Sequence, residues 1–175
     1  MRLMLWIIAG LTALYCGYWA LASRAIRDEA GAMLAAMRAE GTADVATVDV
    51  GGFPARFDVT LGAPQFASRD GTFLWSAPEL RLSAPSYRPQ HVIALLPTEQ
   101  RLLIGRETVA VGSETFSASA VFGLSARAPL DHALTVGKAV VLSSDAGWRL
   151  AADEVRAAIR RGEGEAEQRI GIELL

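Results

Sequence analysis

Residues 45–61 read VATVDVGGFPARFDVTL, and apolar and polar side chains alternate in them on both sides of a glycine- and proline-containing centre. The apolar positions are Ala46, Val48, Val50, Phe57, Val59 and Leu61. Because successive side chains of a β-strand point to opposite faces, this period of two indicates strands with one buried face. Two such runs around a Gly/Pro turn predict an antiparallel hairpin.

Similar short runs continue toward the end of the chain and are separated by prolines and glycines. We predict further strands over residues 72–76, 79–84, 91–96, 100–104, 108–111, 114–122, 134–143 and 168–175. Residues 148–161 fit a helix or a strand, and we favour a strand because the neighbouring runs are strands. The fold class predicted is therefore mainly β with an N-terminal helix, built as a curved antiparallel sheet. Its apolar face needs a cover, which can be the sheet itself, a helix or a ligand.

Length and composition exclude several classes of protein. The chain has 175 residues, which fits one domain with an appendage, and its 51% hydrophobic residues exclude a disordered chain. A net charge of -2 argues against a nucleic-acid partner. The single Cys16 excludes an internal disulfide and a cysteine-based zinc site, and two histidines exclude a His-rich metal site. We expect neither a metal nor a cofactor.

Residues 3–23 contain no charged side chain and are long enough to cross the roughly 30 Å hydrocarbon core of a membrane as a helix. Aromatic residues near both ends are typical of the membrane interfaces; they are Trp6, Tyr15, Tyr18 and Trp19. Arg2 and Arg24 bracket the run. We therefore predict a transmembrane anchor over residues 1–23.

Two alternatives to the anchor remain open. Residues 20–22, Ala-Leu-Ala, fit the cleavage site of a signal peptide, although the apolar run is long and bulky Tyr18 and Trp19 precede the site. A lipoprotein would use Cys16, but Tyr15 stands where a small residue is needed. The arginines flanking the run do not decide its orientation, and the very short N-terminal tail favours export of the bulk of the chain.

Residues 24–41 continue in a helical pattern and form the second part of the chain. Ile26, Ala30, Met33 and Met37 fall on one face with Leu34 beside them, and glycine at position 41 is a suitable stop. We predict a helical stalk or lid here, with a core helix of the next domain as the alternative. A β-rich domain follows over residues 45–175, and because its last strand run reaches the end of the chain, we expect a sheet incomplete at its C-terminus.

The sequence contains no nucleophile elbow, phosphate-binding loop, metalloprotease motif or dinucleotide fingerprint. Asp131 and His132 could be considered as a catalytic triad with Ser143 or Ser144. However, neighbouring residues on a strand point to opposite faces, so Asp131 is poorly placed to orient His132. The glutamates within residues 162–167 alternate with glycine at first and indicate a solvated loop rather than a cation site. We therefore expect a protein that is not an enzyme.

Two motifs carry a resemblance to a known family. The first is GFPARFDVTL at residues 52–61, followed by Pro64; the second is SAP at residues 76–78 with SYRPQHVIA at residues 86–94 and a proline at position 97. Together they resemble the bacterial family numbered 2125 among domains of unknown function. The resemblance implies a membrane-anchored envelope protein, and the family has no established catalytic residues to carry over. We therefore expect a single-pass protein of the bacterial inner membrane with the bulk of the chain in the periplasm. The β-rich pattern is also similar to the AsmA-like envelope proteins, whose curved sheets form apolar grooves for lipid.

These observations favour a non-catalytic role in envelope maintenance, with the lipid bilayer as one partner and a lipid or another apolar ligand as a second. The alternative is a structural module that pairs with a protein through an open sheet edge. Candidate groove residues are the apolar positions of the two clearest strand runs, whose alanines leave room for a chain. They are Phe57, Val59, Leu61, Phe116, Ala118, Ala120 and Phe122.

Overall fold

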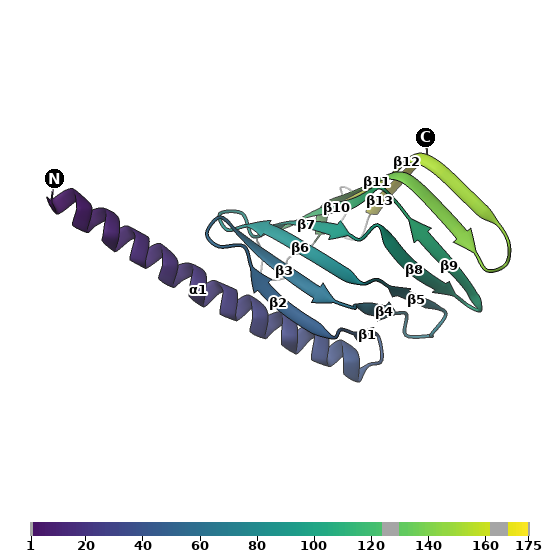
Figure 1. Cartoon of the computed structure of the whole chain (residues 1–175), viewed down its shortest axis with the longest axis horizontal. Coiled ribbons are helices and arrows are strands. Elements are labelled where there is room, and N and C mark those ends of the chain that lie inside the picture. Colours follow the sequence, from purple (N-terminus) through teal and green to yellow (C-terminus); the bar gives the residue numbers. More distant parts are fainter. Residues whose placement is uncertain (1, 124–129, 162–167, 175) are drawn as a thin grey trace.

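The computed structural model describes residues 2–123, 130–161 and 168–174, and it contains one long helix followed by an open antiparallel sheet (Figure 1). The helix is α1 (Arg2–Ala39). The strands are β1 (Ala43–Asp44), β2 (Thr47–Gly51), β3 (Arg56–Gly62), β4 (Gln65–Ala67), β5 (Phe73–Ser76), β6 (Glu79–Pro85), β7 (His91–Leu96), β8 (Glu99–Ile104), β9 (Glu107–Gly112), β10 (Thr115–Phe122), β11 (Leu130–Ser144), β12 (Arg149–Arg161) and β13 (Gln168–Leu174). The predicted fold class is confirmed.

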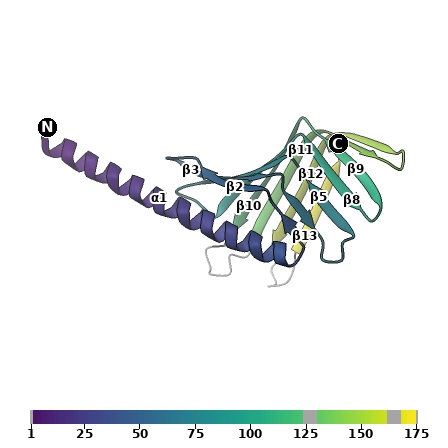
Figure 2. The same ribbon diagram turned by 60° about the horizontal axis from the view of Figure 1, so that its bottom comes forward.

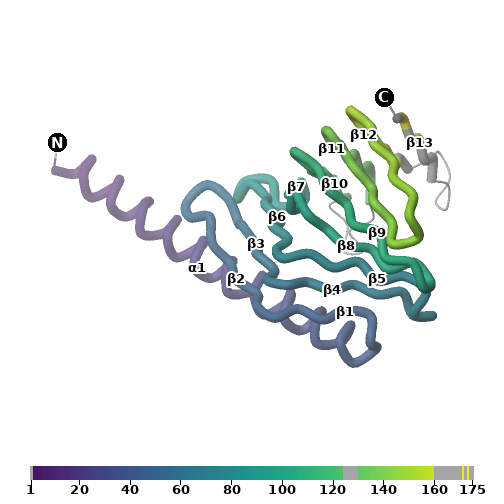
Figure 3. The backbone as a smooth tube through the Cα atoms, turned by 45° about the vertical axis from the view of Figure 1, so that its right-hand side comes forward, coloured from purple at the N-terminus to yellow at the C-terminus, as the bar shows by residue number. Residues whose placement is uncertain are grey.

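The sheet is a meander of long strands, most of which are broken in the middle. Its order is β1-β4-β5-β8-β9-β11-β10-β7-β6-β3-β2, with β12 on the other side of β11 and β13 on β12. The pairs β3/β4, β5/β6, β7/β8 and β9/β10 follow each other in the chain with only two residues between them. They form the two halves of single long strands, and β11 pairs with β10 along its first half and with β9 along its second. The sheet therefore bends across its strands, as Figure 3 shows.

Prolines and two left-handed residues mark the line of this bend. Ala63 has φ 46° and Ala139 has φ 49°, and Pro64, which follows Ala63, is fully buried. Proline has no N–H to donate to the ladder, and a residue with positive φ turns the strand out of its plane. Hydrogen bonds from Ala63 N to Pro78 O (2.8 Å) and from Ala77 N to Pro64 O (3.2 Å) carry the pairing across the break.

Most strands lie where alternation predicted them. The hairpin of residues 45–61 is β2 and β3, in a register that pairs Val50 with Val59 and Val48 with Leu61. Residues 148–161 contain a strand rather than a helix, β12. The sequence patterns did not reveal β1 and β4, because strands of two and three residues show no period.

Helix α1 packs along the edge of the sheet formed by β1 and β2 (Figure 1). Its least exposed residues follow helical spacing; they are Cys16, Trp19, Ala22, Ser23, Ile26, Ala30, Leu34 and Met37. Of the face predicted for residues 24–41, Met33 is 63% exposed, whereas Leu34, predicted beside that face, belongs to the less exposed stripe. The predicted anchor and stalk are parts of one uninterrupted helix.

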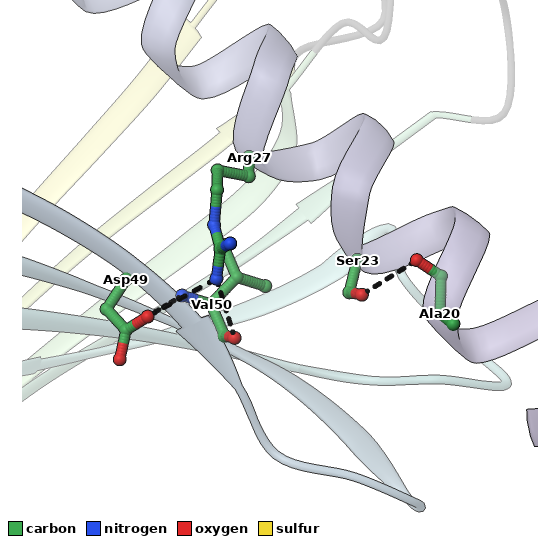
Figure 4. A network of polar contacts seen from close by, with 5 residues as sticks. All are labelled: Ala20, Ser23, Arg27, Asp49 and Val50. Atoms are coloured by element: carbon green, nitrogen blue, oxygen red, sulfur yellow. Dashed lines mark hydrogen bonds and ion pairs between the residues drawn. The ribbon is translucent and has the colours of Figure 1, made fainter.

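Side chains of α1 bind backbone carbonyls of this edge. Arg27 Nη2 donates to Val50 O (3.4 Å) and to Asp49 Oδ1 (3.3 Å), and Ser23 Oγ donates within the helix to Ala20 O (3.1 Å; Figure 4). Further along, Arg38 Nη2 donates to the carbonyl oxygen of residue 45 (2.7 Å). Exposed ion pairs add little stability, but covering an edge strand protects it from pairing with other chains.

Candidate functional site: an apolar trough

A row of ladder partners crosses the sheet on one face and joins the two predicted groove segments. Directly paired residues of neighbouring strands lie on the same face. The row runs Val50, Val59, Leu82, Ala94, Ala118, Thr135 and Ala157. Val59 and Ala118, which the sequence placed in separate strand runs, therefore face the same side of the sheet.

Parallel rows on either side extend this apolar face. On one side, Phe57 pairs with Ala84, and the row Val92, Ala120, Ala133 and Ile159 lies across β7, β10, β11 and β12. On the other side, Leu61 pairs with Leu80, and the row Leu96, Phe116, Gly137 and Val155 continues across the same four strands. We call the surface formed by these three sets of rows the apolar trough.

The trough contains six of the seven predicted groove residues in regular register. The seventh, Phe122, follows a bulge between Val121 and Phe122 and pairs with Leu130. The centre of the trough is made of small side chains, namely Ala94, Ala118, Ala120, Ala133, Thr135 and Gly137. Phe116 lies over Gly137, where an added Cβ would meet its ring at 2.7 Å. The sheet arches over this side with α1 along one rim (Figure 2), and apolar side chains such as Leu82, Val92 and Phe116 stay partly exposed there.

Between α1 and the trough lies an apolar pocket of about 230 Å³. It is lined by Ile26, Phe57, Val59, Leu82, Ser83, Ala84, Pro89 and Val92. Ser83 is the single residue of this lining with a polar side chain, and its hydroxyl is engaged by Asp58 Oδ1 (2.5 Å). The pocket is smaller than a typical site for a drug-sized molecule and is suited to a thin apolar chain.

Near the pocket, an aromatic side chain of α1 packs against two phenylalanines of the sheet domain. The Trp19 ring is stacked on Phe57 with centroids 5.8 Å apart and meets the edge of Phe53 at 5.2 Å. The indole nitrogen of Trp19 donates to Arg56 O (3.1 Å), and Phe57 is only 3% exposed. Sequence reasoning assigned Trp19 to the membrane interface alone; its contact with a strand 38 positions later is visible only in the tertiary structure.

A larger and more polar pocket, of about 520 Å³, lies at the bend of the sheet. Its lining includes Glu99, Arg101 and the buried Gln100. Gln100 is hydrogen-bonded at both ends of its amide: the oxygen accepts from the indole nitrogen of Trp75 (2.9 Å), and the nitrogen donates to Pro97 O (3.2 Å). This buried amide ties β5 to the residues between β7 and β8 at the bend.

Asp131, His132 and the serines at positions 143 and 144 do not form a catalytic triad. Asp131 Oδ2 lies 3.8 Å from His132 Nδ1, which is too far for a hydrogen bond. The two side chains are nevertheless closer than strand alternation predicts, because the bulge in the β10–β11 ladder falls at this point. His132 pairs with Arg160 and Ser143 with Arg149, at opposite ends of β12. Within the described part of the chain, no group of three or more His, Cys, Asp or Glu side chains is close enough to hold a metal ion. The glutamates of the predicted loop at residues 162–167 lie outside the described residues.

The opposite face of the sheet is more polar. Thr60 pairs there with Asp49 and Arg81, and Ser119 pairs with Ile93 and Leu134. Ile93 and Leu134 are 36% and 44% exposed, so this face also carries some exposed apolar area. The alternation of residues 56–61 therefore separates the two faces as predicted.

These features define a class of protein with one N-terminal apolar helix and an open, bent antiparallel sheet. The helix is long and apolar enough to cross a membrane, and it fits a membrane anchor or a signal sequence. The chain belongs to the family described as an uncharacterized protein conserved in bacteria, DUF2125, whose model matches residues 19–175. The family inferred from the two motifs is thus confirmed. No curated protein and no solved structure matches the chain significantly.

Proposed function

We propose that this chain is a single-pass bacterial inner-membrane protein whose periplasmic apolar trough binds a lipid acyl chain, or a similar apolar ligand, without catalysis. The observation that carries the proposal is the trough itself, an apolar face over seven strands with small residues at its centre. Contiguous exposed apolar surface is costly in water and marks an interaction site. A role in maintaining the envelope follows from binding lipid beside a membrane.

The packing of α1 supports a retained anchor over a cleaved signal peptide. Cleavage after Ala22 would remove Trp19 from its stack on Phe57 and would also remove the hydrogen bond from the Tyr15 hydroxyl to Pro54 O (2.5 Å). Phe57 would then lose the ring that covers it. A signal peptide has no need of such contacts with the mature domain.

Lipid binding is tested by a photo-crosslinking residue placed at Ala118, in the trough, and separately at Ser119, on the opposite face. We expect lipid adducts from Ala118 in cells and few or none from Ser119, because only the first position faces the proposed ligand. Mass spectrometry of the purified, detergent-extracted protein identifies the adducts and any lipid that co-purifies.

The matched pair also separates the two candidate functions. If neither position captures lipid and the purified protein carries none, the trough proposal is abandoned. Protein adducts would then favour the interaction module, for which the described part of the sheet offers β13 as an edge, since β13 pairs there with β12 alone.

Anchoring and orientation are tested by fusing alkaline phosphatase after Leu175 of the full chain. We expect an active phosphatase in the membrane fraction, and mass spectrometry should recover a peptide that contains Trp19, because the helix is retained and the domain is exported. A mature protein that starts at Ser23 would show cleavage. An inactive phosphatase, together with an active cytoplasmic reporter at the same junction, would reverse the orientation.

A further inference from the structure

The part of α1 that stands free of the sheet is too short to cross a membrane by itself. Every residue of α1 from Arg2 to Tyr15 is exposed, and the Tyr15 hydroxyl already binds the sheet domain through Pro54 O. The stretch from Leu3 to Leu14 rises only about 18 Å, against the roughly 30 Å of a hydrocarbon core. The whole uncharged run, Leu3 to Ser23, rises about 31 Å and does fit. A membrane spanned by α1 must therefore extend past Tyr15 and Trp19 toward Arg24.

Two loops of the sheet lie beside this last part of the run. The loop between β2 and β3 contacts α1 through Pro54 O, 2.5 Å from the Tyr15 hydroxyl, and through Phe53, whose ring meets Trp19 at 5.2 Å. The loop between β6 and β7 contacts it through Ser86 Oγ, 3.1 Å from the same hydroxyl. Ser86 Oγ also donates to Ala55 O (3.0 Å), which ties the two loops together.

The exposed side chains of these loops suit the headgroup layer of a bilayer. Phe53 is 53% exposed and Tyr87 is 78% exposed, and Pro54, Arg88 and Pro89 are exposed beside them. Aromatic rings gather at membrane interfaces, and arginine reaches from there to the phosphates. Along the helix axis, Trp19 and Tyr15 precede Ser23 by about 6 Å and 12 Å, so a membrane whose hydrocarbon core ends at Ser23 reaches the level of both loops.

We propose that the tips of these two loops, residues 52–55 and 86–90, insert into the same bilayer that α1 spans. This rests on the proposed membrane anchor. The apolar pocket is lined by Pro89 from the second loop and by Ile26 from α1, so it adjoins the loop tips. The trough would then receive its ligand from the adjoining leaflet, without passage of an acyl chain through water.

The test uses the full chain in nanodiscs, with Cys16→Ala as background and single cysteines labelled with an environment-sensitive fluorophore. Phe53→Cys and Tyr87→Cys report on the two loops. Leu5→Cys reports on the anchor, and Arg106→Cys reports on the β8–β9 turn at the other end of the strands. Nitroxide-labelled lipids in the disc quench only fluorophores that reach the bilayer.

We expect labels at positions 5, 53 and 87 to lose most of their fluorescence to the nitroxide lipids, while the label at position 106 keeps it. Phe53 contacts Trp19, so its replacement disturbs the packing of the helix on the loop. The label at position 87 tests loop insertion without disturbing that contact. Quenching at position 5 with both loops as bright as position 106 would overturn loop insertion and leave the anchor intact. No quenching at position 5 would overturn the anchor and, with it, loop insertion.

Discussion

Replacing Phe57 with alanine is expected to lower the free energy of unfolding by about 3–5 kcal/mol, the usual cost of removing a buried aromatic ring. Phe57 is 3% exposed, lies under the Trp19 ring at 5.8 Å and lines the pocket between helix and sheet. The variant leaves a cavity at the one place where α1 and the trough share an aromatic contact. Urea unfolding of the detergent-solubilised chain, followed by tryptophan fluorescence, measures the loss.

Phe73→Ala is the matched control, since it removes the same side chain from a position that is 39% exposed at the start of β5. We expect it to cost about 1 kcal/mol, the centre of the range for single substitutions. Equal losses from the two variants would mean that the helix is not held to the sheet by the Trp19–Phe57 stack. A loss confined to Phe57→Ala would show that the Phe57 ring is buried between the helix and the sheet.

Changing Val59 to aspartate is expected to destabilise the protein by several kcal/mol, because it brings a carboxylate onto an apolar face without a partner. Val59 lies between Val50 and Leu82 in the ladder and lines the pocket opposite Ile26. Thr60→Asp, one residue along, faces the polar side between Asp49 and Arg81 and should cost about 1 kcal/mol or less. The same unfolding measurement compares the two variants.

The pH dependence sharpens this comparison. Position 59 is half-buried on the apolar face, so we expect desolvation to raise the pKa of the new carboxyl in Val59→Asp above its unfolded value. The penalty is then full at neutral pH and shrinks as the pH falls through the folded pKa, because the neutral acid is easier to bury. Thr60→Asp should show no such recovery. Similar losses from both variants at every pH would show that the register of β3 had been misassigned.

Local sequence pattern was sufficient for much of this fold. Alternation in residues 45–61 predicted β2, β3 and their hairpin, because a strand with one buried face has apolar and polar residues at alternate positions. The apolar run before Arg24 predicted a membrane-length helix because about 20 uncharged residues are long enough to cross a bilayer. Local pattern could not predict β1 and β4, which are too short to show a period, nor the choice of Leu34 over Met33, which depends on where the helix meets the sheet.

For the candidate site, the sequence by itself determined which side chains are apolar and that six of them share a face within their own strands: Phe57, Val59, Leu61, Phe116, Ala118 and Ala120. Only the tertiary structure decided that both segments contribute to one trough, because register across β3, β6, β7 and β10 depends on pairings between distant parts of the chain. It also decided the contact of Trp19 with Phe57 and the level at which two loops meet α1. Period is a property of neighbours in the chain, whereas register and docking are set by how well surfaces far apart in the sequence fit together.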